Sequence, residues 1–453
     1  MPQASTPPAI PAIPALPSPA RREPESTADL LRDLPPAPAA PQPPPRDLPP
    51  DEESVRAAAS AAALYEQQLR EKLAQRAAKP RGFLRRNSLA ISLAVTAALA
   101  VIAALVAWQY ERAASRDADI ARYLAAARNG LARDTLAATR ASLEALAEVL
   151  ERAPSHAVAT SLKAQALATL AVVYGEGDPF AAERLVFGTV AKGGERDALL
   201  VARWLLSRGD GSEAVRATVE REILDDPPAD AGATLLSLAG AVLLAKDQPA
   251  LAIERFNAAI RASPGHVPTL VRVADYYRGR ADHEEALRYY GLALAVAEDH
   301  PGALIGAAES TLASAREPRA LEQALAGVGK LRSRAQVPVG DRLRLALVRA
   351  RLRAALGTTE DALAELAGVE IGAEPAQLVA AAQTFVRIGA ADAGLERLAA
   401  FDMATSEDAA LREAHARMLV AAERYREAAG LQARPADRGL LLQIGIAQYW
   451  LGQ

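Results

Sequence analysis

Residues 233–266 read ATLLSLAGAVLLAKDQPALAIERFNAAIRASPGH, and residues 267–300 read VPTLVRVADYYRGRADHEEALRYYGLALAVAEDH. Aligned without a gap, the two stretches agree in a leucine, two small residues and an aromatic residue. The matching pairs are Leu236 with Leu270, Gly240 with Ala274, Ala252 with Ala286, and Phe256 with Tyr290. After a further shift of 34 residues, the pattern continues in Leu304, Ala308 and Ala320. Agreement in three registers at one period indicates an internal repeat.

The spacing inside one period predicts two antiparallel helices. Gly240 on a first helix and Ala252 on a second helix stand where only small side chains let two helices cross closely. Phe256 and Tyr290 then fill the gap to the next pair. Because a single pair buries only one of its faces, the pairs must stack into an array.

On these residues the chain resembles the tetratricopeptide repeat (TPR) family. Residues 233–300 look like two such repeats, with Leu236 and Leu270 in place of the family's usual tryptophan. Weaker matches extend the resemblance over residues 120–453, and they include Ala202, Gly209 and Ala214, then Ala350, Gly357 and Ala362, then Ala382, Gly389, Ala416 and Ala428. The resemblance implies an all-α fold, an α-solenoid of TPR-like helix pairs. Its clearest repeats are 233–266, 267–300 and 301–334.

A second stretch, LAISLAVTAALAVIAALVAW from Leu89 to Trp108, predicts a transmembrane helix within residues 88–110. At ~1.5 Å rise per residue its length reaches the ~30 Å of a bilayer's hydrocarbon core. An alanine-rich helix buried in a soluble core is the alternative. Lys and Arg are more frequent before Leu89 than in a similar window after Trp108. By the positive-inside rule, the N-terminus is predicted to be cytoplasmic and the repeat domain periplasmic, in a single-pass protein of the inner membrane.

Residues 1–50 hold 17 of the 30 prolines, which predicts a disordered Pro-rich tail. This tail is either a passive tether or a ligand for a proline-binding domain. Residues 51–80 predict a cytoplasmic juxtamembrane helix with Asp51 at its N-terminal end. That helix is either solvated or lies against a partner or the membrane.

Composition and motifs give no sign of catalysis. The chain has no cysteine, which excludes disulfides and thiolate metal sites, and its net charge of -3 gives no general attraction to nucleic acid. His266 and His300 lie one period apart and are expected to be solvated loop residues. We therefore predict a protein that is not an enzyme and has no catalytic, cofactor-binding or metal site, although enzymes without a linear motif exist.

The resemblance implies that protein or peptide ligands bind the concave face, which the first helices line. The lysine and asparagine clamp of certain chaperone-binding members is not supported, because its places hold Ser237, Ala241, Val271 and Asp275. Cationic side chains on the expected first helices favour an acidic partner segment instead. The candidate partner-binding residues are Arg272, Asp275, Arg278, Arg344 and Arg351.

These features together predict a membrane-anchored scaffold or adaptor in a bacterial envelope-associated assembly, of the translocation, pilus, motility or envelope-biogenesis type. Two alternatives remain: a transmembrane sensor that couples the repeats to the Pro-rich tail, and an organelle import receptor with its repeats in the cytosol. The last stretch, GLLLQIGIAQYWLGQ at residues 439–453, is expected either to pack back onto the array or to form an interface, with a second copy as a homodimer or with a partner.

Overall fold

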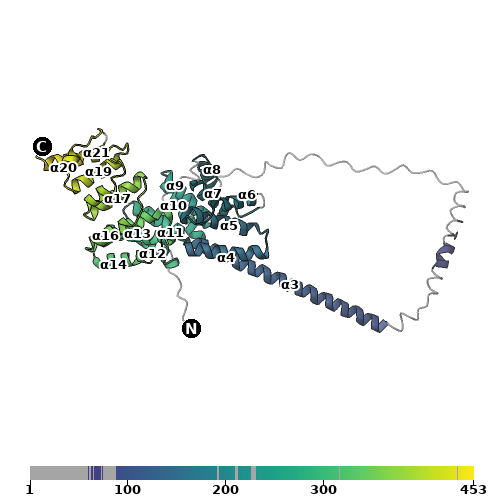
Figure 1. Ribbon diagram of the computed structural model, residues 1–453. Coiled ribbons are helices and arrows are strands. Elements are labelled where there is room, and N and C mark those ends of the chain that lie inside the picture. The colour runs from purple at the N-terminus through teal and green to yellow at the C-terminus, as the bar shows by residue number, and fades with distance from the viewer. Residues whose placement is uncertain are drawn as a thin grey trace, which may run out of the picture. The chain divides into compact units, whose positions relative to one another are not determined.

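The computed structural model describes residues 60, 63–64, 66–72, 74 and 88–453, except for 191–192, 210–212, 226–230, 316, 436 and 453. Within these ranges every regular element is helical (Figure 1). The Pro-rich tail predicted over 1–50, and both limits of the helix predicted over 51–80, lie outside the described residues. Between Ser115 and Arg116 the chain divides into two units.

In the first unit, the part of α3 (Ser88–Arg133) before Arg116 is an apolar helix with an exposed surface. Every residue from 92 to 115 is exposed. The Thr96 hydroxyl donates to the Ser92 carbonyl oxygen at 2.8 Å, so this polar group finds its partner inside the helix. Length and composition would let this helix cross a membrane. The segment Ala157–Tyr174 passes the same test, but 56% of it is buried, as in a core helix.

The second unit consists of short helices that follow one another along the chain. Their bounds are α4 Leu136–Arg152, α5 Ala157–Ala168, the π-helical turn η2 Thr169–Tyr174, α6 Pro179–Val190, α7 Arg196–Gly209, α8 Glu213–Asp225, α9 Ala233–Ala245, α10 Pro249–Ala262, α11 Val267–Gly279, α12 His283–Val296, α13 Pro301–Ser314, α14 Pro318–Gly329, the 3-10 turns η3 Arg334–Gln336 and η4 Val339–Asp341, α15 Arg342–Ala355, α16 Thr359–Ala367, α17 Pro375–Arg387, α18 Ala391–Arg397, α19 Ala409–Ala421, α20 Tyr425–Ala429 and α21 Arg438–Trp450.

These helices pack in the order expected of a solenoid. From α7 to α19 the odd-numbered helices are first helices, and each packs both on the even-numbered helix that follows it and on the next odd-numbered helix. Thus α9 contacts α10 and α11, α11 contacts α12 and α13, and the same order continues to α19 and α21. The predicted all-α array of TPR-like helix pairs is therefore confirmed.

Small residues permit the closest crossings. A Cβ atom on Gly240 would lie 2.5 Å from the Phe256 ring, and one on Gly306 would overlap the Tyr290 ring of the preceding repeat. Ala252 and Ala286 are fully buried. Ala214, which the sequence placed in such a crossing, is instead exposed. In α8 the buried side chains are Val219 and Ile223, which lie four residues apart on one face of the helix, and Ala214 lies outside this face.

One connection is longer than the others. Ala274 and Ala308 lie 34 residues apart, whereas Ala308 and its counterpart Ala350 lie 42 apart, so eight residues are added between α14 and α15. We call residues 330–341 the long connection. Just after it, Arg342 donates through Nη2 to the carbonyl oxygen of Tyr174 at 3.2 Å, and Ala335 within it packs on the cluster of Leu136, Leu170 and Tyr174. Repeats far apart in sequence thus touch.

Candidate functional site

The first helices α13, α15, α17 and α19 form a groove. It consists of two hollows of about 320 and 640 Å3 that share Ala376, Ala380 and Gln383 of α17. We call it the first-helix groove. Helix α15 contributes residues spaced three or four apart, which is the spacing of one helix face. These are Leu343, Arg344, Leu347, Val348 and Arg351. The small side chains on α17 leave the space that larger ones would fill.

Charged side chains from three consecutive first helices meet at the N-terminal end of this groove. Arg344 on α15 holds Glu309 on α13 with two hydrogen bonds of 2.8 and 2.5 Å. Arg278 on α11 reaches the same carboxylate at 3.0 Å. Burial is the largest single effect and lowers the pKa of both arginines, but their acidic neighbours together, Glu309 foremost, raise both pKa values on balance. Both cations therefore stay charged and paired.

Asp275 and Asp341 complete this inner charge network. The Tyr290 hydroxyl donates to Asp275 at 2.6 Å, and Arg278 lies 3.1 Å from the same carboxylate oxygen. Asp341 lies 3.5 Å from Arg344, and burial raises the pKa of its carboxyl group. Three acidic and two basic groups leave no surplus positive charge here.

Two arginines farther along the groove have no acidic partner among the described residues. Arg351 on α15 and Arg387 on α17 line the same 320 Å3 hollow. The pKa of Arg351 is lowered, first by its burial and then by the positive charge of Arg387. A bound anion would relieve both effects, since it would supply the hydrogen-bond acceptor and the countercharge that the protein does not.

The five predicted partner-binding residues therefore separate into different environments. Arg344 and Arg351 line the groove, whereas Asp275 and Arg278 are held in the inner charge network. Arg272 donates to the Ser237 hydroxyl at 2.6 Å, and burial lowers its pKa. Arg387 and Glu309 were missed by the sequence analysis. A signal for Arg387 was present, since it lies at the end of a first helix, but whether an acidic side chain meets it depends on packing between repeats.

The two repeat-spaced histidines are buried, so the expectation of solvated loop residues was wrong. His266 is 2% exposed, with Nδ1 2.7 Å from the Thr269 hydroxyl and Nε2 3.2 Å from the Thr234 hydroxyl. Burial, followed by the charge of Arg272, lowers its pKa to about 4. His300 accepts from the Ala303 amide at 3.1 Å and so caps α13. Both rings complete inter-repeat turns, which explains their recurrence.

No group of three or more His, Asp or Glu side chains in the described part of the chain could hold a metal ion. Comparison with known proteins gave no matching family model and no matching curated protein. One solved structure that it resembles is titled as the TPR domain of P58(IPK). The alignment covers 81% of this chain and 98% of that one, at 16% identity and a TM-score of 0.23. The repeat assignment rests on the helix pairs themselves.

Proposed function

We propose that this chain is a scaffold that binds an acidic, extended segment of a partner protein in the first-helix groove. The pair Arg351 and Arg387 carries the proposal, because both face one hollow and neither has an acidic partner among the described residues. Carboxylates bind guanidinium groups through short, charge-assisted hydrogen bonds, and a groove between stacked helices suits an extended peptide. The chain binds and does not catalyse.

A labelled peptide of alternating glutamate and alanine is the probe for this groove. The purified full-length chain should bind it and should not bind the same peptide with lysine in place of glutamate, as fluorescence anisotropy would measure. The double variant Arg351→Glu, Arg387→Glu should weaken binding by about tenfold or more at constant salt. Arg261→Glu is the matched control, because Arg261 is exposed on the second helix α10. Equal affinity in the double variant and the control would refute the groove assignment.

We further propose that residues 88–110 anchor the scaffold in a bacterial inner membrane, as part of an envelope-associated assembly. The supporting features are the apolar exposed surface of α3 from Leu93 to Val106 and the excess of Lys and Arg before Leu89. The N-terminus is then cytoplasmic, and the repeats are periplasmic. Binding of a second copy through α21, whose Leu442 and Trp450 are exposed, is a further part of this proposal.

Protease added outside an intact inner membrane measures this topology. Residues after Asp117 should be digested, while a tag placed before residue 80 stays protected until the membrane is opened. The opposite pattern would place the repeats in the cytosol, as in the import-receptor alternative, and would contradict the proposed localisation.

A further inference from the structure

A second face of helix α15 borders another cavity. The residues Arg342, Leu345, Ala346, Arg349 and Arg353 follow a three-to-four spacing that is displaced from the groove-lining set. They line a cavity of about 470 Å3 whose remaining walls come from α16 and the long connection. This cavity shares no lining residue with the first-helix groove. It is therefore a separate feature from the site of the proposed function.

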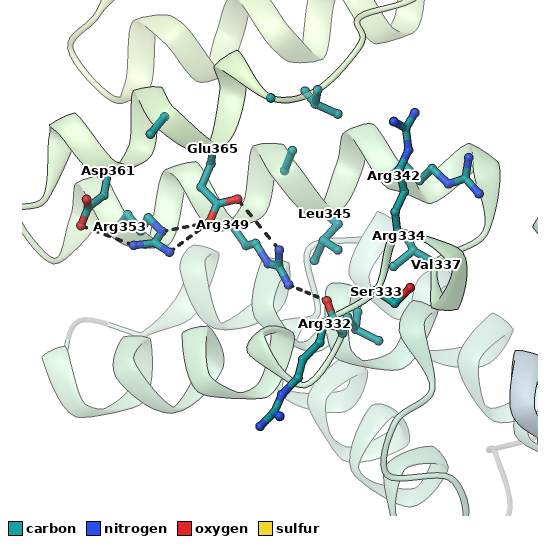
Figure 2. A pocket seen from close by; sticks show the side chains of 15 residues that line it. Arg332, Ser333, Arg334, Val337, Arg342, Leu345, Arg349, Arg353, Asp361 and Glu365 are labelled. Carbon is teal, nitrogen blue, oxygen red and sulfur yellow. Dashed lines mark hydrogen bonds and ion pairs between the residues drawn. The ribbon is translucent and has the colours of Figure 1, made fainter.

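Positive charge dominates the lining of this cavity. Five arginines stand against two acids, Asp361 and Glu365. Arg353 forms an ion pair with each acid, at 3.4 Å from Asp361 and 3.0 Å from Glu365. Arg349 lies 3.9 Å from Glu365. Figure 2 shows these four side chains on one side of the cavity and Arg334 and Arg342 on the other.

The arginines on the other side lack acidic partners among the described residues. Arg334 belongs to η3 in the long connection and is exposed. Arg342 donates from Nη2 to Tyr174, but its Nε is buried without an acceptor in the described part of the chain. An unpaired buried donor is costly, so an anion that reached it would recover the lost hydrogen bond.

The rest of the wall decides the kind of anion. Arg349 is fixed by hydrogen bonds of 2.9 Å to the carbonyl oxygens of Val328 and Leu331, so one guanidinium is already oriented. Leu345, Val337 and Val369 supply apolar surface for a carbon skeleton. Guanidinium groups match the planar, two-oxygen geometry of carboxylate and phosphate, and the cavity volume is that of a small-molecule site.

We propose that this cavity binds a small organic anion that carries two or more carboxylate or phosphate groups. Arg334 and Arg342 hold the anionic groups, and the apolar wall holds the carbon skeleton. The eight added residues of the long connection build the site, since they bring Ser333, Arg334 and Val337 to the cavity. The connections 263–266 and 297–300 of the regular repeats have only four residues each and lack this addition.

Citrate and fructose 1,6-bisphosphate serve as probes, the first for carboxylate groups and the second for phosphate groups on a carbon skeleton. Isothermal titration of the purified full-length chain, at constant ionic strength, should give a dissociation constant below about 1 mM for at least one of them. Arg334→Gln should weaken that binding about tenfold or more. Arg319→Gln is the matched control, because Arg319 is exposed on α14 and lines neither this cavity nor the first-helix groove. It should change affinity by less than about threefold.

Several results would overturn the proposal. These are the absence of measurable binding of both probes by the wild type, equal losses in the two variants, or binding that disappears with added salt in the wild type and both variants alike. Circular dichroism of the variants establishes that each is folded. The groove variant Arg351→Glu, Arg387→Glu should still bind the probe, which separates this site from the proposed function.

Discussion

At the scale of the residue, His266 shows how a polar side chain serves the core. Both of its ring nitrogens contact threonine hydroxyls, one on α9 and one on α11. A hydroxyl can donate or accept, so the neutral ring is fully satisfied. The protonated ring would need two acceptors in a buried place beside Arg272, which explains why its pKa falls to about 4.

Because the pKa of His266 is lowered in the folded state, we expect the free energy of unfolding to fall in mild acid. The unfolded chain protonates His266 near pH 6.5, while the folded chain resists until about pH 4. Stability is therefore fully present above pH 6.5 and falls as the pH drops through this window, by about 2 kcal/mol between pH 7 and pH 5. Urea unfolding at both pH values measures it. His266→Asn should remove that part of the slope, and an unchanged slope would contradict the assignment.

At the scale of the element, the helix crossings were predictable because they depend on local spacing. Ala286 lies on α12 and is fully buried where α12 crosses α11. Ala286→Leu should overpack this crossing and lower the free energy of unfolding by about 1–3 kcal/mol. Ala262→Leu makes the same change on the exposed end of α10 and should stay within about 0.5 kcal/mol. Thermal and urea unfolding of both variants would test this, and similar losses would count against the repeat register.

The charged side chains of the same elements could not be assigned from the sequence. Arg278 and Arg344 were predicted as free cations on first helices. Their carboxylate partner, Glu309, lies 31 and 35 residues away and reaches them only after three helices pack side by side. Arg351 and Arg387 have no ion-pair partner among the described residues, because Glu309, which lines the same hollow, is taken by Arg278 and Arg344. Composition shows which charges exist, whereas pairing between repeats decides which remain available.

At the scale of the whole repeat unit, the long connection joins segments that a simple array would keep apart. The interval between Ala308 and Ala350 exceeds the regular period by eight residues, but the sequence analysis did not use it, and the sequence alone could not have shown where the added residues go. In the structure Arg342 hydrogen-bonds to Tyr174, and the Tyr174 hydroxyl donates to the carbonyl oxygen of Asp134 at 3.1 Å. The early repeats thus gain a contact that nearest-neighbour packing does not provide.

Removing this contact should loosen η2 selectively. Arg342→Met should speed hydrogen exchange of the amides in residues 170–177 by about tenfold, because a buried carbonyl oxygen loses its donor. Arg353→Met removes ion pairs from the same helix without touching η2 and serves as the control. Exchange measured by mass spectrometry should change in the first variant only. Equal protection in both variants would show that the contact adds no stability.

The contact between Arg342 and Tyr174 also bears on how the chain is made. The two residues are separated by 168 positions, so the ribosome releases Tyr174 long before Arg342. Repeats that contact only their neighbours can fold as each pair emerges, but this junction cannot form until α14 and the long connection are complete. Until then the apolar side chains of Leu136, Leu170 and Tyr174 lack the cover of Ala335. The early repeats of the nascent chain therefore keep an uncovered apolar surface that can associate prematurely until the long connection has been made.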